Sequence, residues 1–127
     1  MKPPKKHHDP SIVVVGKVAD SMLDVNRITV DGGFLIWERR DDKTVEIRDI
    51  HVDSEFRRRG LGRKMLELLF RQLDGATRVW AITRAENLVA QQFYEKCQFR
   101  DVSILRRFYN DKTLDAIMFV RCAGGPV

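Results

Sequence analysis

Cysteine is scarce in this sequence, which has only Cys97 and Cys122 among its 127 residues. The two form neither a Cys-x-x-Cys pair nor a disulfide framework, so neither a dithiol redox motif nor a disulfide-stapled secreted fold is indicated. This usage fits a reducing compartment, and we expect both thiols to be structural. Neither lies in a motif suited to a nucleophile, which argues against a covalent enzyme intermediate.

Long hydrophobic runs are also lacking. The longest apolar run near the N-terminus, Ile12 to Val15, is too short for the core of a signal peptide or for a membrane span. We therefore expect a cytoplasmic protein without membrane contact. A composition that is 43% hydrophobic over 127 residues suffices for one domain with its own core. We place this domain at 11–122, between a disordered basic tail at 1–10 and a C-terminal tail at 123–127.

Several ligand-binding motifs are absent. A Walker loop would need a longer glycine spacing ending in Lys-Ser or Lys-Thr, and a dinucleotide fingerprint would need a third glycine. His7 and His8 are adjacent but lack further ligand types at helical or hairpin spacing, so we predict no metal site.

The stretch from Val45 to Leu73 instead reads as a strand, a basic glycine loop and an amphipathic helix in direct succession. The first N–H groups of a helix have no intrahelical acceptor, and the helix dipole is positive at that end, so such a terminus binds phosphate. The loop and first helical turn consist of Arg57, Arg58, Arg59, Gly60, Leu61, Gly62, Arg63 and Lys64. Their five cationic side chains indicate a ligand with several phosphates.

The net charge leaves a second kind of ligand open. A formal charge of +5 would also suit nucleic acid, with the glycine loop as a phosphate clamp. That alternative predicts steeply salt-dependent DNA or RNA affinity. Much of the excess charge lies in the tail and the glycine loop, however, and a small polyphosphate ligand explains the loop equally well.

The strand before the loop contains a change of phase. Val45 and Ile47 alternate with polar residues, but Ile50 and Val52 continue the apolar series only if one extra residue is inserted. We therefore predict a β-bulge near Arg48 or Asp49. A bulge splays the strand from its neighbour and frees the backbone N–H groups of Ile50 to Val52 to face a ligand.

Two motifs in this part of the chain resemble those of the GNAT superfamily of N-acetyltransferases. The series Arg57-x-x-Gly60-x-Gly62 fits the acetyl-CoA-binding pattern Gln/Arg-x-x-Gly-x-Gly/Ala. Asn87 and Tyr94, two helical turns apart, match the second motif, in which the asparagine contacts the pantetheine arm and the tyrosine approaches the thioester sulfur. Taken alone, Asn87 would be an N-cap and Tyr94 a core edge; their joint spacing favours the cofactor.

The resemblance runs from about Val45 to Phe99 and implies a GNAT-like α/β domain with a mixed sheet. Acetyl-CoA would be the co-substrate, without a metal, and acetyl would pass directly to a primary amine. Gln98 departs from the family, which usually has a helix-ending glycine there. The implied cofactor-binding positions are Ile50, His51, Val52, Arg57, Arg58, Arg59, Gly60, Leu61, Gly62, Arg63, Lys64, Asn87 and Tyr94.

Acetyl transfer also needs a base and an acid. A lysine-like amine with a pKa of about 10.4 is almost entirely charged at neutral pH and must lose a proton. We favour Glu46 as the base, because its place in the strand matches the glutamate of some lysine-acetylating GNAT enzymes, with His51 and Asp49 as rivals. Tyr94 is the expected acid, because a phenol is protonated at neutral pH and can give its proton to a thiolate.

The remaining segments set the predicted topology. We expect short strands at 12–18, 27–30, 34–39, 45–52, 78–83, 100–108 and 114–121, and a second helix at 87–96. The helical crossover between 45–52 and 78–83 implies that these two strands pair in parallel. We assign Trp80 to the core.

Ala19 to Arg27 has room for one or two helical turns, whereas the family usually places two helices there as a wall of the acceptor site. The acceptor therefore stays open. A protein or peptide amine is slightly favoured, and a small-molecule amine or a non-catalytic acyl-CoA sensor remains an alternative. A second subunit in a homodimer could complete the site.

Overall fold

The computed structural model describes residues 13–17, 24–106, 108 and 115–125. The predicted basic tail at 1–10 lies outside these residues. So do most of the segment between the first two strands, at 18–23, and the turn of the last predicted hairpin.

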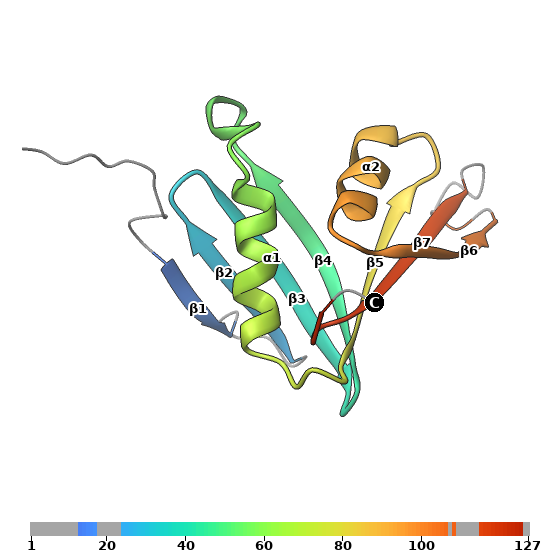
Figure 1. Ribbon diagram of the computed structural model, residues 1–127, viewed down its shortest axis with the longest axis horizontal. Coiled ribbons are helices and arrows are strands. Elements are labelled where there is room, and N and C mark those ends of the chain that lie inside the picture. The colour runs from blue at the N-terminus through green and yellow to red at the C-terminus, as the bar shows by residue number, and fades with distance from the viewer. Residues whose placement is uncertain (1–12, 18–23, 107, 109–114, 126–127) are drawn as a thin grey trace, which may run out of the picture.

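The described residues form a seven-stranded mixed sheet with the order β1-β2-β3-β4-β5-β7-β6 (Figure 1). Neighbouring strands are antiparallel except β4 and β5, which are parallel as predicted. The elements are β1 (Val13–Lys17), β2 (Val25–Val30), β3 (Gly33–Asp41), β4 (Thr44–Val52), the 3₁₀ helix η1 (Ser54–Phe56), α1 (Leu61–Arg71), β5 (Arg78–Arg84), α2 (Leu88–Lys96), β6 (Arg100–Leu105) and β7 (Ala116–Cys122).

The first helical region differs from its prediction. Val25 to Arg27, expected at the end of a short helical segment, already belongs to β2 and pairs with β3 from Glu38 to Ile36. β-branched Val25 and the alternating burial of the strand favour this pairing. The connection from β1 to β2 is thus shorter than the sequence suggested.

Both α-helices pack on one face of the sheet (Figure 1). α1 buries Met65, Leu66 and Leu69, each at most 1% exposed, against the alternate inward residues of β2 to β5. Truncating a fully buried leucine such as Leu69 to alanine costs about 2 to 5 kcal/mol. The assignment of Trp80 to the core was wrong: it is half-buried and alternates with buried Val79, so it lies on the opposite face.

α2 ends at Lys96, as predicted, and the chain leaves it through a left-handed turn at Gln98. Gln98 has a φ of 73°, its N–H donates to Glu95 O, and the N–H of Phe99 donates to Tyr94 O at 2.9 Å. This pair of bonds is a Schellman motif with glutamine in the place that glycine normally takes. The motif fixes the path from α2 into β6.

Candidate functional site

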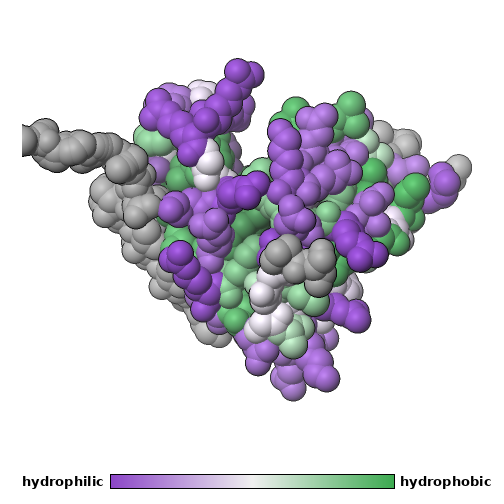
Figure 2. Space-filling model, in the orientation of Figure 1, coloured by the Kyte–Doolittle hydropathy of each residue, from purple (hydrophilic) through white to green (hydrophobic). Residues whose placement is uncertain are grey.

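The sheet parts between β4 and β5. The two strands pair only from Thr44 to Ile47 on β4 and from Arg78 to Ala81 on β5. Beyond these four pairs β4 follows β3 and β5 follows β7. Figure 2 shows a notch with a largely hydrophilic rim between the 53–60 loop and α2, on the side where the strands part.

The predicted β-bulge is present at this parting. Ile47 pairs with Trp37, but Asp49 pairs with the next residue of β3, Ile36, so Arg48 is the extra residue. The bulge restores the phase, because Ile50 and Val52 then pack partly buried against the core. It also turns the end of β4 away from β5, as a bulge bends its strand.

The loop after β4 leads directly into the N-terminus of α1. The Asp53 N–H donates to Gly32 O at 2.8 Å. Phe56 packs on the turn between β2 and β3, since a Cβ on Gly32 would lie 2.4 Å from its ring. Gly60 is the N-cap, in the left-handed region at φ 76°, and has no side chain to cap the first N–H groups of α1. These groups remain donors for a ligand.

Gly60 and Gly62 of the motif are required for different structural reasons. A Cβ on Gly60 would meet nothing within 4 Å, so its backbone conformation is what requires glycine. A Cβ on Gly62 would lie 2.9 Å from Phe93 of α2. Gly62 thus lets the two helices approach each other beside the notch, a contact that the sequence did not reveal.

The cationic side chains surround the α1 terminus. The Arg57 Nε donates to Val52 O at 3.2 Å, and the Arg63 Nη2 donates to Lys96 O at 3.0 Å. The Arg59 guanidinium lies 5.6 Å from the centre of the Phe56 ring. Arg58 is exposed and holds a φ of 64°. Local contacts therefore orient the side chains of Arg57, Arg59 and Arg63.

Asn87 is the N-cap of α2. Its Oδ1 accepts a hydrogen bond from the Ala90 N–H at 3.0 Å, which is the capping role that Asn87 would have if taken alone. The amide nitrogen of the side chain is not part of this bond and is a donor on an exposed residue.

Tyr94 lies seven residues later on the inward side of α2. It is 5% exposed, and its ring contacts Phe93, Phe99 and Phe119 at centroid distances of 5.1 to 5.8 Å. Burial raises the pKa of Tyr94 well above its usual value, with smaller contributions from Cys97 and Asp49. The phenol is therefore neutral throughout the physiological range.

The three candidate bases occupy different surroundings. Glu46 faces away from buried Val45 and Ile47 and forms an ion pair with Arg40 at 3.2 Å. His51 contacts Asp53 at 3.0 Å and stacks on Phe34. Asp49 is the carboxylate of β4 whose charge reaches Tyr94.

Sequence reasoning missed the partners of Glu46. Glu38 stands opposite Glu46 across β3 and β4 and is 6% exposed. It pairs with Arg48 and, at 3.4 Å, with Arg40. The pairing of Glu38 with Glu46 follows from the register of β3 and β4. To predict that register from the sequence, the exact position of the turn between the two strands would have been needed.

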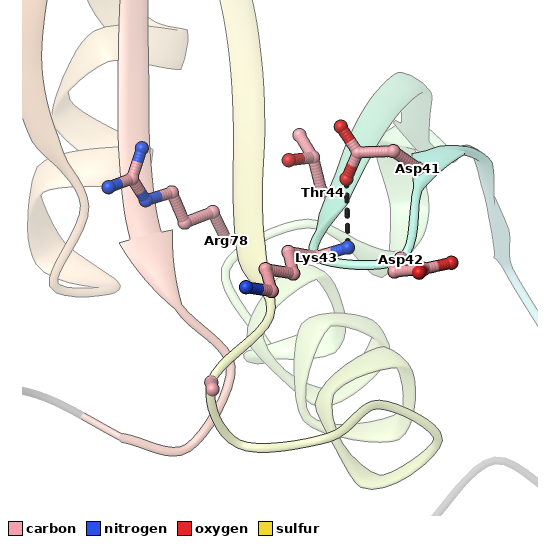
Figure 3. A pocket seen from close by; sticks show the side chains of 6 residues that line it. Asp41, Asp42, Lys43, Thr44 and Arg78 are labelled. Atoms are coloured by element: carbon pink, nitrogen blue, oxygen red, sulfur yellow. Dashed lines mark hydrogen bonds between the residues drawn. The ribbon is translucent and has the colours of Figure 1, made fainter.

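A separate hollow opens at the other end of β4, at the turn from β3 (Figure 3). Asp41, Asp42, Lys43, Thr44, Ala76 and Arg78 line it. The Lys43 N–H donates to Asp41 Oδ1 at 2.8 Å, which lowers the pKa of that carboxyl. The polar groups thus serve the turn itself, and the hollow is remote from the notch.

The described ranges hold no group of three or more His, Cys, Asp or Glu side chains arranged for a metal ion. No helix among them is long and apolar enough to span a membrane.

Comparison with known proteins assigns the chain to a family. A sequence model of the acetyltransferase (GNAT) family matches residues 26–99. The [ribosomal protein bS18]-alanine N-acetyltransferase of Salmonella typhimurium is 41% identical over 63 residues, 48% of this chain and 43% of that protein. N-alpha-acetyltransferase RimI of Mycobacterium tuberculosis is 32% identical over 81 residues, 64% of this chain and 51% of that protein. The chain spans about half the length of these curated relatives.

Solved structures share the fold. The crystal structure of the ribosomal-protein-S18-alanine N-acetyltransferase from Escherichia coli has a TM-score of 0.64 and 29% identity, covering 81% of this chain and 70% of that one. Arabidopsis thaliana NAA60 in complex with a bisubstrate analogue has a TM-score of 0.67 at 21% identity, covering 78% and 75%. The second likeness concerns the fold alone.

Proposed function

Because the chain belongs to the acetyltransferase (GNAT) family, we propose that it is an acetyl-CoA-dependent N-acetyltransferase whose acceptor is a primary amine of a protein or peptide. One observation carries the proposal. An α-helix N-terminus without a side-chain cap stands in a basic loop, beside the place where two neighbouring strands part. A nucleotide thioester needs both a site for its phosphates and a channel for its arm.

The residues around the α1 terminus fit the phosphates. The free N–H groups after Gly60 and the guanidinium groups of Arg57, Arg58 and Arg59 are donors and positive charges on one exposed loop. Asn87 offers a further donor at the start of α2. The bound acetyl-CoA would supply the activated acetyl group, and the chain would hold it in place.

The amides at the end of β4 are suited to the developing oxyanion. The bulge at Arg48 turns Ile50 to Val52 away from β5, so some of their N–H groups face the parting. Fixed backbone donors in such a place stabilise negative charge with little reorganisation.

The proposed base and acid lie on opposite faces of the sheet. Glu46 projects from the face opposite α2, where it would take a proton from the incoming amine. Tyr94 approaches from the α2 side, where it would give a proton to the departing thiolate. This separation suits direct transfer, because the amine and the thiol need not share one side.

The acceptor assignment is supported by the names of relatives. Several of them are N-acetyltransferases of ribosomal protein bS18 alanine or of N-alpha amines. The short connection between β1 and β2 leaves less chain to wall off the acceptor side, which suits an extended peptide. A cytoplasmic location and a homodimer remain predictions.

Calorimetry and peptide acetylation test the proposal together. We expect the purified chain to bind acetyl-CoA and to release free CoA in the presence of peptides with an unblocked N-terminus. Binding without release from any peptide or small amine would favour the acyl-CoA sensor instead. Steeply salt-dependent affinity for DNA or RNA without CoA binding would favour the nucleic-acid alternative.

Glu46→Gln tests the base. Removal of a general base lowers turnover by about 100-fold or more, and acetyl-CoA affinity should not change. Asp49→Asn and His51→Gln serve as matched variants of the rival bases. The role moves to a rival if the pH–rate profile of Glu46→Gln keeps its acidic limb.

A further inference from the structure

Thr83 occupies the first inward position of β5 beyond its pairing with β4. Val79, Ala81 and Thr83 are the buried residues of the alternating strand, and Ala81 belongs to the last β4–β5 pair, with Ile47. Thr83 therefore lies where the two strands have parted. It is nevertheless 6% exposed.

The Thr83 hydroxyl has no hydrogen-bond partner in the part of the chain that the structure describes. Leaving a buried polar group unsatisfied costs about 1 to 3 kcal/mol, and valine would fill the same volume without that cost. Threonine at this position is thus unfavourable for the ligand-free fold.

The surroundings of Thr83 are those of the candidate site. After Ile47 and the extra residue Arg48, the next inward residue of β4 is Ile50, so Thr83 and Ile50 are the first inward residues on either side of the parting. α2, which carries buried Tyr94, packs on the same face. The end of β4, Thr83 of β5 and Tyr94 of α2 therefore lie on the same face of the sheet, at the parting.

Trp37 provides an internal contrast. Its Nε1 is the other buried side-chain group without a partner among the described residues. Trp37 pairs with Ile47, inside the closed part of the sheet, where β4 and β5 are still joined. Only the threonine lies where a ligand could supply the missing bond.

We propose that Thr83 is a cofactor-contacting residue, whose hydroxyl bonds the amide-and-thioester arm of acetyl-CoA between β4 and β5. A hydroxyl can donate to a thioester or amide carbonyl and accept from an amide N–H, so it suits this arm. The inference rests on the proposed function, because it needs the arm to enter the parting.

Calorimetry with two ligands and three variants tests the contact. The ligands are acetyl-CoA and 3′-phosphoadenosine 5′-diphosphate, which keeps the phosphates and lacks the arm. Thr83→Val should weaken acetyl-CoA binding about 3- to 10-fold, the range of one hydrogen bond, and leave the diphosphate affinity unchanged. Thr83→Ser, which keeps the hydroxyl, should stay within about twofold of the original chain for both ligands.

Trp37→Phe is the matched control, because it removes the other unpartnered group and should alter neither affinity. Equal weakening of both ligands by Thr83→Val would overturn the proposal and make the residue structural, and so would unchanged affinity for both. Thr83→Ala gives the same comparison should the valine variant fail to fold. If the original chain binds neither ligand, the proposed function itself fails.

Discussion

Gln98 and Arg58 hold backbone conformations that glycine normally takes. Their φ values are 73° and 64°, and they are the non-glycine residues with positive φ in the described ranges. A left-handed conformation costs an ordinary residue about 1 to 2 kcal/mol. Gln98 ends α2 at this cost, and Arg58 places a cation at the tip of the loop.

Gln98→Gly should raise the free energy of unfolding by about 1 kcal/mol, since relief of the strain exceeds the extra flexibility of glycine in the unfolded chain. Denaturant unfolding measures the change. Gln98→Ala keeps the strain and should give no gain. Equal stability of the glycine and alanine variants would show that the helix end carries no strain.

Burial of Tyr94 links stability to alkaline pH. Its folded pKa is raised, and the unfolded side chain ionises near its ordinary value of 10.0. Above that pH the unfolded chain binds fewer protons than the folded one, so stability is full below pH 10 and falls as pH rises further.

The chain should therefore lose stability more steeply than Tyr94→Phe between about pH 9.5 and 11, by up to about 1.4 kcal/mol per pH unit. Urea titrations at several pH values measure the difference. Parallel curves for the two proteins would mean that the phenol ionises equally easily when folded.

At the scale of elements, α1 and α2 are coupled through Gly62 and Phe93. Gly62→Ala alone gains about 1 kcal/mol of helix propensity but displaces the Phe93 ring. Leucine at position 93 lacks the ring atoms that a Cβ at position 62 would meet. In the Phe93→Leu background, Gly62→Ala should therefore be stabilising. A double-mutant cycle should therefore give a coupling of about 1 kcal/mol.

Gly60→Ala is the control for this cycle. A Cβ there meets nothing, so the substitution should cost about 1 kcal/mol of backbone strain whether residue 93 is phenylalanine or leucine. Coupling of similar size at both glycines would contradict the assignment of separate roles.

Most elements could be predicted from the sequence. Apolar periodicity placed β4, α1 and α2, and the phase change between Ile47 and Ile50 located the bulge. Trp80 was misplaced, because an aromatic residue in a short apolar strand does not reveal which face is covered. That depends on where both helices pack, which is a property of the tertiary fold.

The site was predicted unevenly for the same reason. The loop and the α1 terminus are local, and their spacing identified them. The contact of Gly62 with Phe93 and the pairing of Glu46 with Arg40 join residues from different elements, and the burial of the Thr83 hydroxyl depends on elements far away in the sequence. No spacing rule in one stretch of chain reports them.

At the scale of the whole molecule, the parting divides the sheet into β1 to β4 and β5 to β7. Acetyl-CoA at about 100 times its dissociation constant should stabilise the folded state by about 2.7 kcal/mol. Hydrogen exchange should locate the effect. Peptides from Asp49 to Val52 and from Ile82 to Arg84 should gain protection on binding, whereas Thr44 to Ile47, already paired, should not.

Protection confined to the 53–60 loop would contradict this expectation, because it would mean that only the phosphates are held. ADP makes a suitable control ligand, since it lacks the arm.

The short seam between β4 and β5 has a mechanical consequence. Four residue pairs and the helices packed on the inward face join the two parts of the sheet, and so short a seam resists tilting less than strands paired along their full length. A ligand bound along the unpaired edges of β4 and β5 would therefore stiffen the two parts of the sheet relative to each other.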